Sequence, residues 1–265
     1  MDNQDVENRQ INSNDIFVQL TDDVNAEIAA IAERQRKANG LLMKAVNFVG
    51  GQVEDGLKLL PKSTRGKVED VAKMALRRSY EVASKSRNGV GQNFDSDGLH
   101  RAMGALTGAV GGLGGLSTAM AELPVATTVI FRAVQGVAVQ HGEDPLADET
   151  RMACLAVFGS GGPGSADDGI DTSFIGARLT ISGAAVNGLI NKVAPRFATI
   201  LSQKLASQAV PILGAAAGAS TNYAFVDYYV SMAHVHFALR KLGRVHGDDV
   251  VTEEFHRVLT LPNNL

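Results

Sequence analysis

Residues 102–121 read AMGALTGAVGGLGGLSTAMA and residues 205–226 read LASQAVPILGAAAGASTNYAFV, and neither stretch contains a charged residue. Glycines recur every four residues in both, at Gly104, Gly108 and Gly112 and at Gly214 and Gly218. A spacing of four places small residues on one face of an α-helix, where a second helix backbone can approach closely. The two stretches predict two long Gly-rich apolar helices that pack against each other at the centre of the fold.

A membrane-inserting hairpin is the alternative for these stretches, because about twenty apolar residues can span a bilayer. Glycine, however, costs roughly 0.8–1 kcal/mol per residue relative to alanine inside a helix. The first stretch carries six glycines, which are unfavourable unless another helix packs against them. We therefore expect burial within the fold, which still allows peripheral contact with a membrane.

The rest of the chain shows apolar residues at helical spacing and no sustained strand alternation. The prediction is an all-α, single-domain helical bundle over residues 21–265, preceded by a flexible, polar N-terminal arm at residues 1–20. We expect Gly40 to interrupt the first helix, because glycine is a poor helix former. We expect Leu123-Pro124 to open a later helix, because proline suits the first helical turn.

The amino-acid composition and charge of the chain limit the kinds of function that we expect. The chain has 265 residues, of which 45% are hydrophobic, and a formal net charge of −3. Without a general basic excess, nucleic acid is not an expected partner. The single cysteine, Cys154, lies in an apolar run and is expected to be buried and inert. The N-terminus is polar and lacks the pattern of a signal peptide, so we expect a cytoplasmic location.

Residues 62–87 form a predicted basic amphipathic helix. They contain eight basic and three acidic residues, a local charge of 8 − 3 = +5. Such a helix can lie on an anionic membrane surface, although an ordinary solvated face has the same composition. The candidate lipid- or membrane-contact residues are Lys67, Lys73, Arg77, Arg78 and Lys85, together with Gly104, Gly108 and Gly112 of the Gly-rich helix.

Motifs of known enzymes are weak or missing in the sequence. Residues 159–164 read GSGGPG and satisfy GxGxxG, but no acidic residue lies about 20 positions further on, as a dinucleotide site requires. The chain contains no GxxxxGK[ST], GxSxG or HExxH motif. We expect no resident cofactor.

A divalent metal site is the enzymatic alternative. Its candidate ligands are Asp167, Asp168, Asp227, His234 and His236. On an unbroken helix, His234 and His236 point about 200° apart and cannot both bind one ion. Further ligands would have to come from elsewhere, such as His100, His141 or Asp168.

Several motifs occur in an order that resembles a known family. They are the Gly-rich run before Glu122-Leu123-Pro124, the run from Cys154 to Gly159 followed by Asp167-Asp168, the run from Gln208 to Gly214, and His236-Phe237 with Arg240-Lys241-Leu242. Together they resemble the EcsC family of bacterial proteins over about residues 40–258. The resemblance implies a protein associated with membranes or lipids, without an agreed catalytic mechanism. Glu122 stands where aspartate is expected more often.

The sequence therefore favours a non-enzymatic, peripheral membrane-associated or lipid-binding protein at the inner face of the membrane, with an anionic membrane surface or lipid as its partner. One alternative is a metal-dependent hydrolase that uses the Asp and His residues named above. Another is a scaffold for a membrane transporter, since the family takes its name from a gene beside an ABC-transporter operon. Enzymatic activity and oligomeric state stay open at this stage.

Overall fold

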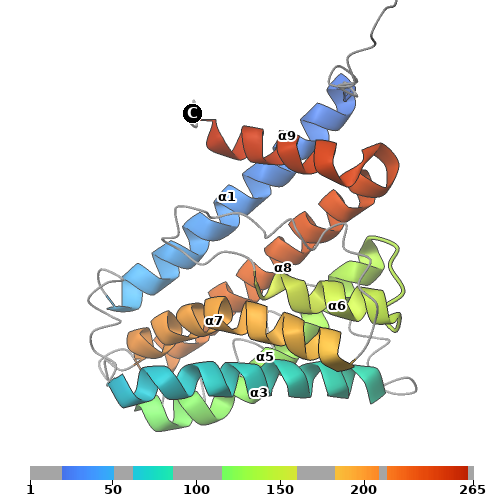
Figure 1. Ribbon diagram of the computed structural model, residues 1–265. Coiled ribbons are helices and arrows are strands. Elements are labelled where there is room, and N and C mark those ends of the chain that lie inside the picture. Colours follow the sequence, from blue (N-terminus) through green and yellow to red (C-terminus); the bar gives the residue numbers. More distant parts are fainter. Residues whose placement is uncertain (1–19, 51–61, 86–114, 160–182, 209–213, 262–265) are drawn as a thin grey trace, which may run out of the picture.

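The computed structural model describes residues 20–50, 62–85, 115–159, 183–208 and 214–261. Within these ranges the chain is helical and contains no strand, which confirms the predicted all-α class (Figure 1). The helices are α1 (Asp22–Gly50), α3 (Lys62–Lys85), α5 (Gly115–Gln140), α6 (Asp148–Val157), α7 (Gly183–Gln208), α8 (Gly214–His246) and α9 (Asp248–Thr260).

Figure 1 shows how these helices are arranged. At the bottom of that view α3 packs against α5 and α7, and α6 lies above them. In the upper half α1 and α8 run side by side, and α9 crosses the top in contact with both. Because α5 and α7 also contact α8, this helix connects the lower layer to the upper one.

Two predicted helix boundaries are wrong. α1 continues through Gly40, and α5 begins at Gly115, ahead of Leu123, and continues through Pro124. Both helices continue because apolar side chains next to these positions are buried. Their tertiary packing stabilises the helix by more than the propensity cost of glycine, which is about 1 kcal/mol. Ala38 and Leu42 flank Gly40 in the core, and Leu123 is fully buried beside the proline.

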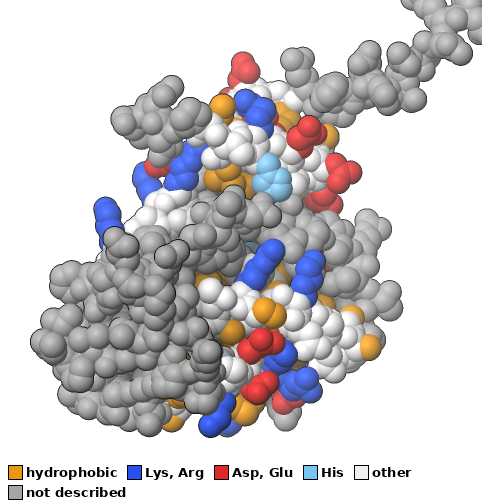
Figure 2. Space-filling model, turned by 60° about the vertical axis from the view of Figure 1, so that its left-hand side comes forward, with side chains coloured by type: hydrophobic (Ala, Val, Ile, Leu, Met, Phe, Trp, Pro, Cys, Tyr) orange, Lys and Arg blue, Asp and Glu red, His pale blue; other side chains and the backbone are white. Residues whose placement is uncertain are grey.

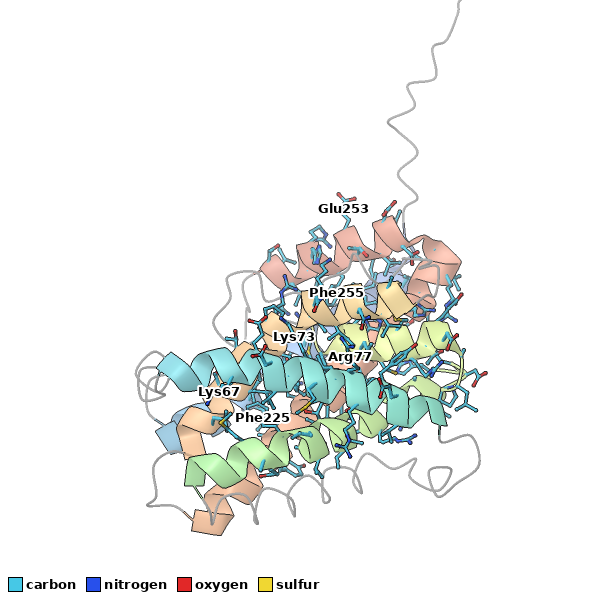
Figure 3. The ribbon with its side chains drawn as sticks, turned by 60° about the horizontal axis from the view of Figure 1, so that its bottom comes forward. Lys67, Lys73, Arg77, Phe225, Glu253 and Phe255 are labelled. Carbon is cyan, nitrogen blue, oxygen red and sulfur yellow. The ribbon has the colours of Figure 1, made fainter. Side chains whose placement is uncertain are left out.

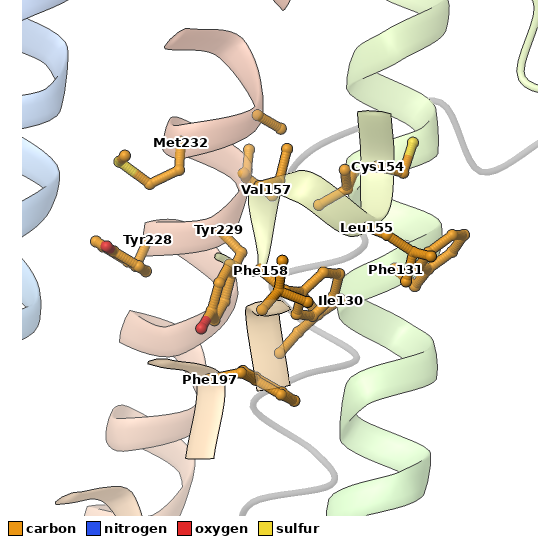
Figure 4. Packing of buried hydrophobic residues seen from close by; sticks show 14 of the residues in the cluster. Ile130, Phe131, Cys154, Leu155, Val157, Phe158, Phe197, Tyr228, Tyr229 and Met232 are labelled. Atoms are coloured by element: carbon orange, nitrogen blue, oxygen red, sulfur yellow. The ribbon is translucent and has the colours of Figure 1, made fainter. Parts of the chain in front are cut away.

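The described core is organised around aromatic side chains (Figure 4). Phe158, which follows α6, stacks on Tyr229 of α8 and meets Phe197 of α7 edge-on, each with ring centroids 5.0 Å apart. Phe131 of α5 stacks on the opposite side of Phe158 at 6.1 Å. Aromatic pairs at these separations contribute beyond their buried area. Phe158 therefore joins four helices at one point.

The predicted central packing of the two Gly-rich helices is not tested by these contacts. Residues 102–114 lie outside the described residues, and so do the side chains of residues 214–222. Predictions about Gly104, Gly108, Gly112 and the arm at residues 1–19 therefore stay predictions. The described part of α8 that lies in the core begins at Ala224.

The C-terminal helix α9 is fixed to α1 and α8. Val251 and Phe255 of α9 are buried in the core. Arg36 of α1 donates hydrogen bonds to the backbone carbonyls of Val258 at 2.5 Å and Leu259 at 3.3 Å. A cation at a helix C-terminus satisfies carbonyls that have no partner in the helix and is stabilised by the helix dipole. Arg36 thus caps α9.

Candidate functional site

The outer face of α3 is the first candidate, since sequence reasoning assigned membrane contact to it. Val68, Ala72 and Leu76 face the core and are fully buried. Figure 3 shows Lys67, Lys73 and Arg77 along this helix, with α3 at the front of the molecule. The side chains of Lys67, Arg77 and Arg78 are exposed. The predicted separation of an apolar and a basic face is confirmed for these residues.

The candidate basic residues of α3 differ in their surroundings. Lys73 donates to Glu69 across one helical turn, with Nζ 2.7 Å from Oε1. This hydrogen bond raises the pKa of Lys73 above its ordinary value, and desolvation opposes the increase only in part. The carboxylate of Glu69 therefore partly neutralises the charge of Lys73, whereas Arg77 and Arg78 face solvent. The side chain of Lys85 lies outside the described residues.

Exposed apolar side chains accompany this charge. Met74 of α3 and Val125 of α5 are both 55% exposed. The hydroxyls of Ser79 on α3 and Thr128 on α5 lie 3.2 Å apart, and Arg132 of α5 donates to the carbonyl of Val82 at 3.5 Å. From the first contact to the second, the residue number increases on both helices, so α3 and α5 run parallel. Exposed apolar side chains therefore occur on both of these packed helices.

The rest of the visible surface carries both charges. Figure 2 shows Lys and Arg side chains next to Asp and Glu side chains on the described part of one face. α3 itself has seven basic residues (Lys62, Arg65, Lys67, Lys73, Arg77, Arg78, Lys85) and three acidic ones (Glu69, Asp70, Glu81), a balance of 7 − 3 = +4. The basic character is therefore a local property of α3 in a chain whose net charge is −3.

One segment of the described chain meets the length and composition of a membrane span. Residues Met120–Gln140 of α5 are long and apolar enough, and half of their most apolar window is buried inside the fold. The core helix of a water-soluble protein satisfies the same criterion, so this observation is weak evidence for spanning. The alternative of membrane insertion considered from the sequence concerned residues 102–121, of which 102–114 lie outside the described residues.

The predicted metal ligands are only partly described. Asp167 and Asp168 lie outside the described residues. Asp227 and His234 are half-buried on α8, while His236 is completely buried. In the described ranges no three His, Cys, Asp or Glu side chains come together as metal ligands. The predicted divergence of His234 and His236 is confirmed.

His234 instead pairs with His141, which immediately follows α5. Nε2 of His141 lies 3.1 Å from Nδ1 of His234, a hydrogen-bond distance at which one nitrogen donates and the other accepts. Burial, together with smaller effects of the positive charges of His234, Lys241 and Arg34, lowers the pKa of His141 from 6.5 to about 4. The sequence placed both histidines among candidates, but 93 residues separate them, and no local spacing could reveal their contact.

His236 is completely buried, and its ring nitrogens are unsatisfied within the described part of the chain. Neither ring nitrogen has a hydrogen-bond partner in the described structure, and the same holds for the hydroxyl of Tyr229 two turns earlier on α8. Burial, with a smaller contribution from Arg240, lowers the pKa of His236 to about 3. The ring is therefore neutral near pH 7.

Cys154 is completely buried, as predicted. Burial raises the pKa of its thiol far above the ordinary value, against a smaller opposite effect of Arg240. A thiol that stays protonated is a poor nucleophile. This observation excludes Cys154 as a reactive cysteine in the folded protein.

An ion-pair network holds the end of α5 against α8 and was not predicted. Glu143 accepts hydrogen bonds from Arg240, at 3.2 Å, and from Arg244. Arg240 also lies 3.7 Å from Glu149 of α6. Because Glu143 and Arg240 are largely buried, their pairing fixes the turn that carries His141.

Comparison with known proteins gives one family. No significant match to a curated protein or to a solved structure was found. The model of the EcsC protein family matches residues 4–242. The match begins earlier in the chain than the motifs had suggested, and it ends before α9. Because it covers most of the 265 residues, this chain belongs to the EcsC protein family.

Proposed function

We propose that this chain is a peripheral membrane-binding protein that contacts anionic lipid headgroups through the outer face of α3. The observation that carries the proposal is the exposure of Arg77 and Arg78 on the same helix as Met74, whose apolar side chain is 55% exposed. Met74 precedes Arg77 and Arg78 by about one helical turn, so the three side chains lie on one face of α3. At a membrane surface both kinds of side chain find partners.

The magnitude of the charge contribution is adequate for reversible binding. Each Lys or Arg close to an anionic leaflet contributes about 1 kcal/mol, and the attraction falls off within a Debye length of about 8–10 Å. Lys67, Arg77 and Arg78 supply three such charges. Insertion of Met74 and of Val125 on α5 adds apolar burial. Binding therefore combines a salt-sensitive and a salt-resistant part.

Co-sedimentation with vesicles tests the proposal. Vesicles of neutral phosphatidylcholine are compared with vesicles that also contain phosphatidylserine, over a series of salt concentrations. The wild-type protein should bind the anionic vesicles and lose much of this binding as salt increases. The double variant Arg77→Glu/Arg78→Glu should bind them at least tenfold more weakly, because two attractive charges become repulsive.

A matched control separates the face from the net charge. Lys37→Glu/Arg257→Glu makes the same change in charge on α1 and α9, away from α3, which packs against α5, α6 and α7. This variant should retain most of the binding. Equal losses in both variants, or wild-type protein that binds no vesicle at low salt, would contradict the proposal.

A further inference from the structure

The His141–His234 contact lies at a junction of three helices. His141 follows the last turn of α5, His234 lies in the middle of α8, and α1 packs along α8. The two imidazole rings meet edge-on with centroids 5.3 Å apart. Phe237, one turn further along α8, stacks on His141 with centroids 6.4 Å apart. Both rings are thus held in place by packing as well as by their hydrogen bond.

Two further basic side chains surround this pair. Lys241 follows His234 by seven residues and lies on the same face of α8. Arg34 of α1 and Lys241 both lie close enough for their charges to act on the ring of His141. Both side chains are exposed, and neither forms an ion pair within the described part of the chain. Basic side chains from three elements, namely Arg34 of α1, His141 after α5, and His234 with Lys241 of α8, therefore lie around this point.

The carboxylates near the two histidines either pair with other basic side chains or do not act on the ring of His141. Glu143 follows His141 by two residues but accepts hydrogen bonds from Arg240 and Arg244. Glu33 precedes Arg34 on α1 but pairs with Arg36 and Lys37, at 3.7 and 3.5 Å. Asp227 is two turns from His234 on α8 and is half-buried. None of these carboxylates appears among the charges that act on His141.

We propose that His141, His234, Arg34 and Lys241 form a binding site for a phosphate group. A phosphate carries up to two negative charges and several strong acceptor oxygens, which match donors that come from different directions. A bound phosphate favours protonation of the pair, because a neighbouring anion offsets the repulsion from the surrounding positive charges.

The same geometry opposes a metal ion at this place. Two neutral imidazoles 3.1 Å apart could serve as ligands, but the charges of Arg34 and Lys241 repel a divalent cation. The site also goes beyond the membrane surface proposed for α3. In the described structure α3 packs against α5, α6 and α7, whereas the phosphate site faces α1 and α8.

Titration with inorganic phosphate, followed by the NMR resonances of the histidine rings, is the test. Phosphate should raise the pKa of His141 from its low value in the free protein, because a neighbouring anion stabilises the protonated ring. His256 on α9 is exposed and provides an internal reference that should change little. Absence of any change at His141 and His234 at saturating phosphate would overturn the proposal.

Substitutions at the exposed positions identify the donors without disturbing the core. Arg34→Gln/Lys241→Gln should weaken phosphate binding about tenfold or more, because two charged donors are removed. Lys37→Gln/Lys44→Gln removes two exposed charges of α1 and should leave the affinity within about twofold. Equal weakening in both variants would show a general charge effect and overturn the site. Zinc binding that depends on both histidines, with no phosphate binding, would overturn it as well.

A second arm identifies the source of the phosphate group. Vesicles that contain phosphatidic acid are compared with soluble phosphate, using the Arg34→Gln/Lys241→Gln and Arg77→Glu/Arg78→Glu variants. A loss of vesicle binding in the first variant assigns the site to a lipid headgroup. Retained vesicle binding, with lost binding of free phosphate, assigns it to a soluble phosphorylated compound. The α3 variant should keep its phosphate response in either case, so the two proposals can fail separately.

Discussion

α8 and α3 show two different ways in which a helix is specified in this protein. Tyr228, Tyr229 and Val230 point in directions about 100° apart, and all three are buried. This part of α8 is therefore buried around most of its circumference, and only the face with Asp227, Ser231 and His234 is half-buried. α3 buries one stripe through Val68 and Leu76 and leaves its opposite face to solvent.

This difference in burial predicts that substitutions on α8 change stability, whereas substitutions on the outer face of α3 change binding. A substitution in the enclosed part of α8 or its neighbours changes packing between several helices, so its cost appears in the free energy of unfolding. A substitution on the outer face of α3 removes no contact between helices. Its effect should appear only when the protein meets a partner. The predictions below test this separation, from the largest expected effect to the smallest.

Phe158→Ala should give the largest loss. Its ring contacts Tyr229, Phe197 and Phe131, and truncation of a buried phenylalanine costs about 3–5 kcal/mol. Urea unfolding followed by circular dichroism measures this change. Tyr223→Ala on the exposed part of α8 is the matched aromatic control and should stay within about 0.5 kcal/mol of wild type. Similar costs for both would show that the aromatic cluster is not the centre of stability.

Gly159→Ala should cost about 1–3 kcal/mol through overpacking. A Cβ at this glycine would lie 2.8 Å from Cγ1 of Val193 on α7, which is closer than such atoms approach. In a Val193→Ala background the same substitution should cost clearly less, because the obstructing methyl group is gone. Gly188→Ala, at a helical position with open space, should instead leave stability equal or slightly higher. A cost that is independent of Val193 would disprove this explanation.

The sequence predicted those features of the helices that depend on a local pattern. The predictions failed where residues distant in the sequence determine whether a helix continues. The periodicity of Val68, Ala72 and Leu76 on α3 is visible in one short segment, and so is the divergence of His234 and His236. Continuity of α1 through Gly40 depends instead on what packs beside Ala38 and Leu42. Local propensity alone therefore predicted a break that tertiary burial removes.

The candidate site divides in the same way. Exposed arginines on α3 follow from helical geometry, and the structure places them as predicted. The contact of His141 with His234 joins residues that lie 93 positions apart, and the ion pairs of Glu143 join α8 to the turn after α5. Such contacts depend on how α5 and α8 pack. No pattern within either helix contains that information.

Stability should fall as the pH decreases from about 6.5, because His236 is buried in its neutral form. Its pKa is about 3 in the folded protein and about 6.5 in an unfolded chain. Between these values the unfolded chain binds a proton that the folded protein does not, so the free energy of unfolding decreases by up to about 1.4 kcal/mol per pH unit. The half-buried His141, with a pKa of about 4, adds an effect of the same sign that is similar in size down to about pH 5.

His236→Leu isolates this contribution. The variant should lose about half of the pH dependence between pH 6.5 and 5, because His141 supplies a similar share in this range. It should be at least as stable as wild type at pH 7, since it removes buried nitrogens without partners. His256→Leu at an exposed position should keep the wild-type dependence. Unfolding curves at several pH values measure both. An unchanged slope in the His236 variant would show that its ring is hydrated or protonated in the folded state.

Met74→Ser on α3 should have the smallest effect on folding and a selective effect on binding. The side chain is 55% exposed, so the free energy of unfolding should change by no more than about 0.5 kcal/mol. Vesicle binding at high salt should decrease, because the charges are screened there and apolar insertion dominates. Val245→Ser, at an apolar position near the end of α8 that is 72% exposed, controls for general hydrophobicity. If both serines weaken high-salt binding equally, the apolar contribution does not come from α3. The contrast between the largely buried α8 and the proposed membrane-binding face of α3 would then rest on charge alone.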